Sequence, residues 1–370
     1  MNDTAAARIY REFEELTEID SVSFSERLMA DTLKTKLRTL GFEVWEDSAG
    51  EQLRGTAGNL YGFLKGQLPG PPILLSAHMD TVTPGIGKQA VLREDGQITS
   101  AGETVLGADD VCGLVEILEG VRRVQERGIP HRDVEVLFTV AEEAYGQGAS
   151  AFDFGQIRAR EAYVFDLSGP VGTAALQAPS ILSFQVEVLG RAAHAGFEPE
   201  KGIHAIQILS EAVSRMKLGH LDEETTLNIG QIEGGTARNI VPEVCVCRGE
   251  IRSFCHEKAL ETAEYVEQTV REAAEGTGAE VRMKTEVHLE AYQTEENDPV
   301  VERFAEACRV LGLPGEKIST FGGSDNNHLV RRGLHGIVLS CGMYRVHSTG
   351  EYTTFKDLEL GAELAAGLIC

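Results

Sequence analysis

The stretch Val134-Glu-Val-Leu-Phe-Thr-Val-Ala-Glu142-Glu143 carries the pattern that decides the fold, because an apolar run ends in two acidic residues. A second apolar run ends in the same way, at Pro72-Ile-Leu-Leu-Ser-Ala-His78-Met-Asp80. Short apolar runs of this kind are typical of strands that are buried on both faces of a sheet. The chain is therefore expected to present carboxylates and an imidazole at the ends of two buried strands.

Strands and helices alternate through the first 180 residues and again after about residue 290. Apolar periodicity predicts helices at 5–18, 24–40, 111–125, 298–311, 325–332 and 356–368. Apolar runs predict strands near 42–46, 58–64, 73–77, 134–140, 162–166 and 336–340. Ser23 and Glu26 have the spacing of a capping box at the start of the second helix. The alternation predicts an α/β fold with a mixed, mostly parallel sheet and helices on both faces.

The pattern changes between residues 181 and 288. Predicted strands and helices follow one another at 183–189, 202–217, 225–233, 243–252, 257–275 and 279–288. Their order is β-α-β-β-α-β, which is the ferredoxin-like order. We therefore expect an inserted α+β domain at 181–288, and one discontinuous domain built from 1–180 and 289–370.

The composition of the 370-residue chain excludes several classes of partner. A formal net charge of −24 argues against nucleic acid and anionic membranes. The N-terminus lacks the basic segment and apolar core of a signal peptide, and no apolar run approaches the roughly 20 residues that span a bilayer. The seven cysteines are scattered. These features together predict a cytoplasmic protein with reduced thiols.

Further acidic or imidazole groups stand at the ends of predicted elements. Asp109 and Asp110 precede a helix, Asp166 ends a strand, and His347 follows the last predicted strand. Each has an ordinary alternative reading as an N-cap, a turn residue or a surface residue. In open α/β sheets, however, the carboxyl ends of the strands line the ligand site. Together these groups indicate a metal-dependent hydrolase in which one spare carboxylate transfers protons.

The motifs resemble those of the co-catalytic dizinc peptidases and deacylases, a family that includes peptidase T, carboxypeptidase G, aminoacylase and succinyl-diaminopimelate desuccinylase. The matching stretches are Ser76-Ala-His-Met-Asp-Thr81, Gly107-Ala-Asp-Asp110, Ala141-Glu-Glu143, Phe165-Asp166, Arg191-Ala-Ala-His-Ala-Gly196, Gly234-Gly-Thr-Ala-Arg-Asn239, Gly322-Gly-Ser-Asp325 and His347-Ser-Thr-Gly-Glu351. Their layout is most similar to peptidase T, although this chain is shorter between the first two stretches. The resemblance implies a zinc exopeptidase-like fold in which the inserted domain is a lid.

The resemblance also implies a role for each matching residue. The ligands of two zinc ions, for which cobalt or manganese could substitute, would be His78, Asp109, Glu143, Asp166 and His347. Asp109 would bridge the two ions and precede a cis peptide bond. Groups that act on the reaction would be Asp80, which orients His78, Glu142, the general base, and His194, a donor to the oxyanion. Groups that grip the substrate would be Asn239, Arg252, Gly323 and Ser324.

The implied function is cleavage of short peptides by an aminopeptidase of the peptidase T type. A dizinc amidase, deacylase or carboxypeptidase acting on N-acyl amino acids would use the same groups and stays open as an alternative. A non-catalytic metal-binding or peptide-binding protein on the same fold is a more remote one, because Glu142 is present. The inserted domain could also join two copies of the chain into a homodimer.

Overall fold

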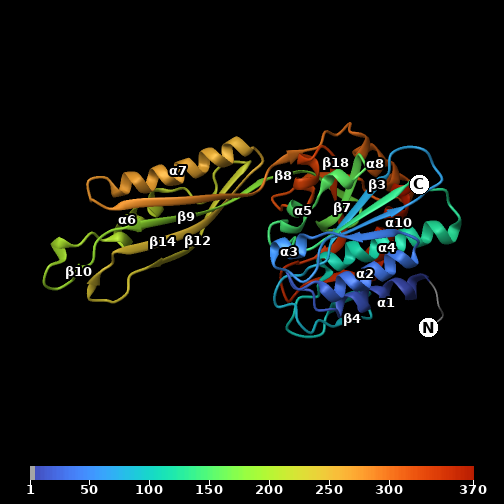
Figure 1. The fold of residues 1–370 in the computed structure, drawn as a ribbon, viewed down its shortest axis with the longest axis horizontal. Helices are drawn as coiled ribbons and strands as arrows, with labels where there is room; N and C mark the ends of the chain where they lie inside the picture. The colour runs from blue at the N-terminus through green and yellow to red at the C-terminus, as the bar shows by residue number, and fades with distance from the viewer. Residues whose placement is uncertain (1–4) are drawn as a thin grey trace. The chain divides into compact units, whose positions relative to one another are not determined.

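The computed structural model describes residues 5–370, which form two compact units (Figure 1). The first unit contains the chain up to Gln177 together with Gln293–Thr320 and Ser324–Cys370, and the second contains Ala178–Tyr292 and Phe321–Gly323. Among the helices of residues 5–370, none has the length and apolar character that a bilayer crossing requires.

A mixed twelve-stranded sheet forms the centre of the first unit. Its main path runs β1-β2-β6-β3-β7-β18-β19-β5-β4, and β8, β16 and β17 lie off this path. The bounds are β1 Glu43–Glu46, β2 Leu60–Leu64, β3 Ile73–His78, β4 Ala90–Leu92, β5 Gln97–Ser100, β6 Val134–Thr139, β7 Glu161–Ser168, β8 Thr173–Ala178, β16 Tyr292–Gln293, β17 Glu316–Ser319, β18 His335–Tyr344 and β19 Tyr352–Thr354. Strands β6, β3, β7 and β18 are mutually parallel, so their carboxyl ends meet at one edge.

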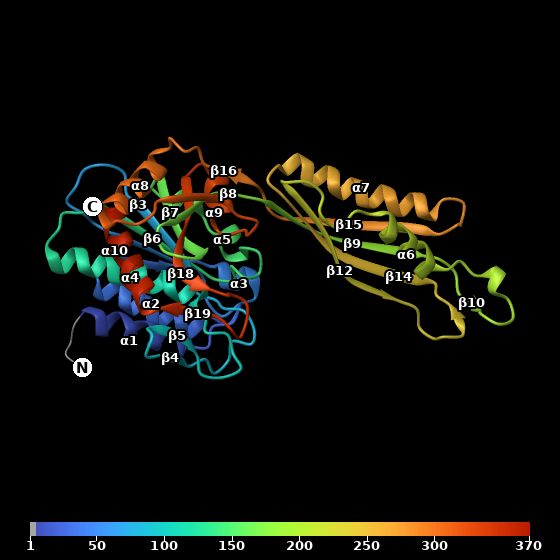
Figure 2. The same cartoon turned by 180° about the vertical axis from the view of Figure 1, so that it is seen from behind.

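Helices cover both faces of this sheet, because the central strands are apolar on both sides. Leu75 of β3 belongs to the larger core, whereas its neighbour Leu74 belongs to a second core on the opposite face. The larger core includes side chains of α1 Ala5–Thr17, α2 Arg27–Thr39, α4 Ala108–Arg127, α8 Pro299–Leu311 and α10 Phe355–Ile369. Short helices lie at α3 Ala49–Leu53, α5 Gln147–Ala151 and α9 Asn326–Arg331. The predicted α/β class is confirmed, and Figure 2 shows the arrangement from behind.

One local prediction was wrong, and several strands were not predicted at all. No strand was predicted at β8, because Thr173-Ala-Ala-Leu-Gln-Ala178 is rich in alanine and has few β-branched or aromatic residues. The capping box is also absent: α2 begins after Glu26, and no side chain caps it. The Ser23 hydroxyl donates to Asp80 instead, at 2.7 Å. Both polar side chains of the expected box are thus directed to tertiary partners.

The second unit is an antiparallel sheet in the order β11-β12-β14-β9-β15. The strands are β9 Ser180–Leu189, β11 Gly219–His220, β12 Thr225–Gly234, β14 Val244–Ser253 and β15 Glu280–Leu289. Helices α6 Ala205–Arg215 and α7 His256–Ala274 share a separate core with this sheet (Figure 1). A small ribbon pairs β10 Ala193–His194 with β13 Ile240–Val241. The four long strands have the order of a ferredoxin-like sheet.

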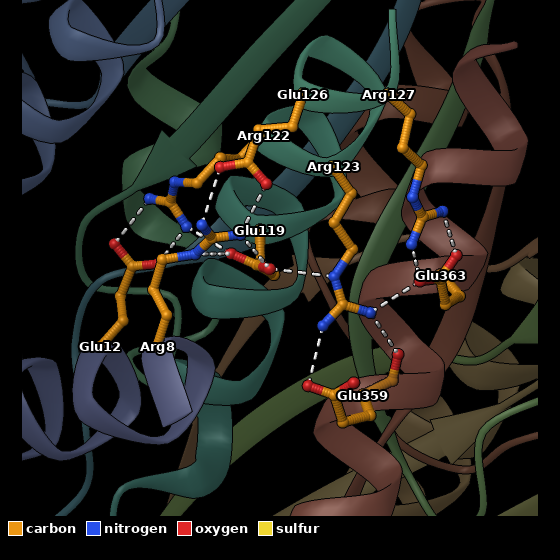
Figure 3. Close-up of polar contacts among 9 residues, drawn as sticks. All are labelled: Arg8, Glu12, Glu119, Arg122, Arg123, Glu126, Arg127, Glu359 and Glu363. Atoms are coloured by element: carbon orange, nitrogen blue, oxygen red, sulfur yellow. Dashed lines mark hydrogen bonds and ion pairs between the residues drawn. The ribbon is translucent and has the colours of Figure 1, made fainter. Parts of the chain in front are cut away.

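Helices α1, α4 and α10 are joined by a network of ion pairs (Figure 3). Glu119 of α4 is fully buried and binds three guanidinium groups, those of Arg8, Arg122 and Arg123. Arg123 in turn reaches α10, at 2.8 Å from Glu359. The buried carboxylate therefore connects the N-terminal helix to the rest of the core.

Glu116 lies on α4 as well, but both of its carboxylate oxygens are buried and neither has a hydrogen-bond partner among residues 5–370. The carboxyl group occupies the space above Gly361 of α10, where an added Cβ would lie 1.9 Å from it. Burial, together with Asp110 and Asp357, raises the pKa of Glu116 well above its usual value. The folded protein thus keeps this carboxyl protonated to a higher pH than the unfolded chain does.

Glu116→Gln is expected to stabilise the protein as the pH rises. Between the pKa of an unfolded glutamate and the raised folded value, the native state binds a proton that the unfolded state lacks, so the parent loses about 1.4 kcal/mol of stability per pH unit. The glutamine of the variant cannot ionise, so its stability does not fall with pH at this position. The measurement is the free energy of unfolding from pH 5 to 8, and a difference between the two proteins that does not grow with pH would contradict the assignment.

Candidate metal centre

The carboxyl ends of the parallel strands bring together two groups of ligand-type side chains. His78 ends β3, and Asp166 lies near the end of β7. Asp109 belongs to the first turn of α4, where it and Asp110 have non-helical backbone angles and are joined by a cis peptide bond. Among residues 5–370, two sets could each hold a metal ion: His78, Asp109 and Asp166; and Asp109, Glu143 and His347.

The Asp109 carboxylate is common to both sets, and its two oxygens face different histidines. Oδ1 lies 3.0 Å from Nε2 of His78, and Oδ2 lies 3.2 Å from Nε2 of His347. One further carboxylate completes each set. Asp166 lies 3.7 Å from His78, and Glu143 lies 3.0 Å from His347. This is the geometry of a carboxylate that bridges two adjacent cation sites.

The turn after β6 separates the two adjacent glutamates. The strand ends at Thr139, and Ala141 has a left-handed φ of 50°. The alternation of a strand therefore stops before Glu142, which removes the requirement that neighbouring side chains point to opposite faces. Glu143 joins the second ligand set, whereas Glu142 belongs to neither.

Hydrogen bonds determine which nitrogen of His78 is available as a ligand. Its Nδ1 lies 2.9 Å from the main-chain oxygen of Asp80, which can only accept, so Nδ1 carries the proton. The Asp80 carboxylate is farther from this nitrogen, at 3.5 Å. The carboxylate instead accepts the N–H groups of Glu142 and Glu143, at 2.9 and 3.2 Å. Asp80 thus orients His78 through its main chain and the glutamate turn through its side chain.

The electrostatics of the centre favour added positive charge. Hydrogen bonds to Asp109 and Glu143 raise the pKa of His347 to about 10. Burial alone would lower the pKa of His78, but its contacts with Asp109 and Asp166 outweigh burial and raise it well above its usual value. Burial raises the pKa of Asp166 to about 7. Each shift keeps a proton in a cluster that has more carboxylates than cations.

The donor set fits two divalent ions. With Nδ1 directed to the main chain, Nε2 of His78 faces a carboxylate oxygen of Asp109 at 3.0 Å, a position that a proton occupies in the metal-free protein and that a metal ion could take. One oxygen of Glu143 is buried and has no hydrogen-bond partner from the described residues. Imidazole nitrogens and carboxylate oxygens are ligands that zinc accepts. The chemistry of these side chains is therefore that of a dinuclear metal site.

Known proteins match the chain over almost its full length. A family model described as peptidase family M28 matches residues 59–179, and one described as a peptidase dimerisation domain matches residues 177–281. The YqjE protein of Bacillus subtilis is 37% identical over 98% of this chain and 97% of its own. A tripeptidase structure from Staphylococcus aureus is 34% identical, covers 98% of this chain and 97% of its own, and has a TM-score of 0.95. The aminopeptidase PepT structure from Bacillus cereus is 35% identical, covers 98% of both chains, and has a TM-score of 0.92.

The matched dimerisation domain is that of the M20 peptidases, and the chain belongs to this family. The resemblance that the sequence motifs indicate is thereby confirmed. A structure from Bacillus subtilis described as a dinuclear metal binding peptidase of the M20 family has the same fold, with 18% identity and a TM-score of 0.74.

The remaining predicted residues of this M20 peptidase lie mostly in the second unit. His194 accepts the N–H groups of Gly196 and Phe197 at Nδ1, so its proton is on Nε2, and its ring stacks on Phe197 at 4.2 Å. Arg252 binds Glu250 and donates to the main-chain oxygen of Phe321 at 2.7 Å.

The other three predicted substrate-binding groups are Asn239, Gly323 and Ser324, and each has contacts within the protein. The main-chain oxygen of Asn239 accepts the N–H of Ala195. Gly323 is packed so closely against Leu289 that an added Cβ would lie 2.3 Å from that side chain. Ser324 is buried in the first unit, where its N–H donates to Asn327. The use of these residues toward a substrate stays a prediction.

Sequence reasoning missed the carboxylates that hold the ligand-bearing loops of the M20 site. Glu351 accepts the N–H groups of Gly107 and of Asp109 itself, at 2.7 and 3.0 Å. The side chain of Asp110 accepts the N–H of His78 at 3.0 Å. Glu351 stands in a stretch that matches the family, four residues after His347, and this position was the only signal. Its role depends on a contact with Asp109, which lies 242 positions away in the sequence.

Binding of a divalent metal ion at the two ligand sets is expected to release protons, and the apparent affinity is expected to rise with pH. Both histidines must bind as neutral ligands, but their raised pKa values mean that the metal-free protein holds protons there at neutral pH. Each displaced proton contributes about a tenfold gain in affinity per pH unit. Calorimetry in buffers of different ionisation enthalpy measures the release, and an affinity that is equal at pH 6 and pH 8 would contradict it.

Proposed function

We propose that this chain is a dinuclear zinc aminopeptidase that acts on short peptides. The observation that carries the proposal is the Asp109 carboxylate shared by two histidine-containing ligand sets, with the unligated Glu142 beside them. The similarity to a tripeptidase and to the aminopeptidase PepT supports the substrate class.

The residues that hold the ions would be His78 and Asp166 for one, Glu143 and His347 for the other, and Asp109 for both. Zinc suits this set of imidazoles and carboxylates, although cobalt and manganese have overlapping preferences. When bound, the ions would supply Lewis acidity to the scissile carbonyl group and to water.

Glu142 would act as the general base. Its carboxylate would take a proton from the attacking water and return it to the nitrogen of the leaving amine. Burial, together with Asp166, raises the pKa of Glu142 well above its usual value, which lets the protonated form donate to the leaving amine at a pH where an exposed glutamate would be a carboxylate.

His194 would donate from Nε2 to the oxygen on which negative charge develops. Its Nδ1 is occupied by two main-chain N–H donors, so the neutral ring presents a donor and not an acceptor to solvent. Asn239, Arg252, Gly323 and Ser324 would bind the polar groups of the peptide. The inserted domain at 181–288 would be the lid and would join two copies, a role supported by the match of residues 177–281 to a peptidase dimerisation domain.

The test combines metal analysis with a panel of free tripeptides, N-blocked peptides and N-acyl amino acids. We expect two zinc ions per chain and cleavage of the free peptides from the N-terminus. Cleavage confined to N-blocked peptides or N-acyl amino acids would replace this proposal by the amidase, deacylase or carboxypeptidase alternative. Light scattering of the intact protein tests the homodimer.

A further inference from the structure

Three successive N–H groups of the glutamate turn donate to buried carboxylates. Glu26 accepts the N–H of Ala141 at 3.1 Å, and Asp80 accepts those of Glu142 and Glu143. The turn has a left-handed residue at Ala141 and cannot satisfy these donors as a strand would. Its conformation is therefore determined by side chains from elsewhere in the chain.

One of those contacts comes from a short segment before α2, residues 21–26, and the same segment also contacts Asp80. The Ser23 hydroxyl donates to the same Asp80 oxygen that receives the N–H of Glu143. Glu26 is fully buried, and its Oε1 accepts from Phe24 at 2.7 Å as well as from Ala141. The segment thus supplies one carboxylate that holds the turn, Glu26, and contacts the other, Asp80. It contains none of the candidate metal ligands, and Glu26 lies more than a hundred positions before Ala141 in the sequence.

We propose that Ser23 and Glu26 are positioning residues, which fix the main chain of residues 141–143 and thereby place the general base and one metal ligand. The roles of Glu142 and Glu143 in this inference rest on the proposed function. The hydrogen bonds that hold the turn are independent of it. Glu26 acts on the turn directly, and Ser23 acts through Asp80.

The two oxygens of Glu26 have different environments, and this gives a conservative variant. Oε1 receives both N–H groups, whereas Oε2 is buried and has no hydrogen-bond partner in the part of the chain that the structure describes. Glu26→Gln keeps an acceptor in the place of Oε1, but Glu26→Ala removes it. Glu135 offers a matched control, because it is also fully buried and also accepts two successive main-chain N–H groups, those of Arg158 and Ala159.

The experiment compares Glu26→Ala, Glu26→Gln, Ser23→Ala and Glu135→Ala in the full-length chain. Amide hydrogen exchange of residues 141–143, zinc affinity by chelator competition, and kcat and KM for a tripeptide are measured separately. Glu26→Ala is expected to accelerate exchange at 141–143, to weaken zinc binding by about 10- to 100-fold, and to lower kcat with little change in KM. Glu26→Gln should recover most of each loss, and Ser23→Ala should show a smaller loss of the same kind.

Glu135→Ala is expected to lower the melting temperature without changing zinc affinity or exchange at 141–143. Equal effects of Glu26→Ala and Glu135→Ala on zinc affinity, or unchanged exchange at 141–143 in Glu26→Ala, would overturn the proposal. If Glu26→Ala does not fold, unchanged exchange and zinc affinity in Ser23→Ala would overturn it instead. A parent chain that binds no zinc would refute the proposed function only, since the exchange experiment would still decide whether the segment holds the turn.

Discussion

Glu142→Gln is expected to lower kcat by about 10²- to 10⁴-fold while the protein keeps its metal ions. The carboxylate lies beside both ligand sets but belongs to neither, so its loss should leave binding of the ions intact. Glutamine has the same shape and cannot accept a proton. The loss therefore measures proton transfer alone.

The measurement is kcat for a tripeptide together with the metal content of the same preparation. Glu143→Gln is the matched control, because it changes the neighbouring residue in the same turn but removes a ligand of the second set. That variant should lose metal and activity together. Unchanged turnover of Glu142→Gln with metal retained would refute the assignment of the general base.

Glu119→Gln is expected to destabilise the first unit by about 3 kcal/mol, within the range for breaking a buried ion pair. The Glu119 carboxylate is fully buried between three arginines, as Figure 3 shows. The expected loss is at the low end of the range because Arg123, the most buried of the three, keeps Glu359 and Glu363 as partners.

The dependence on pH provides a second readout for Glu119. Burial alone would raise the pKa of Glu119, but its contacts with Arg8, Arg123 and Arg122 outweigh burial and lower it. The stabilisation is therefore present above the pKa of an unfolded glutamate and is lost as the pH falls through the lowered value. Glu119→Gln should have its full effect at pH 7 and little effect in acid.

Urea unfolding with chelator present measures the free energy of unfolding of Glu119→Gln and of the parent protein. Glu126→Gln removes an exposed partner of Arg8 from the same helix and should cost less than about 1 kcal/mol. Glu116→Gln, three residues before Glu119, should have the opposite sign at pH 7, because that carboxyl has no cation beside it. A similar loss of unfolding free energy in Glu119→Gln and Glu126→Gln would contradict the larger contribution assigned to Glu119.

The strands that end in polar groups could be predicted because burial on both faces leaves an apolar run in the sequence, as at Ile73–His78. The turn of Ala141 could not, because its φ of 50° is imposed by carboxylates that lie far away in sequence. The Ser23 and Glu26 spacing was misread for the same reason. Local capping and tertiary contacts use the same side chains, and only the folded chain shows which partner is chosen.

The second unit begins with β9 and its long strands end with β15, and these strands pair antiparallel with Ile181 opposite Leu289. Paired Cα atoms are only about 5 Å apart, so the polypeptide enters and leaves this sheet at one place. A segment that has its own core and whose two ends lie close together can be inserted or deleted as one piece, because a short linker can then join the flanking parts of the other unit. The two parts of the gene can consequently diverge at different rates.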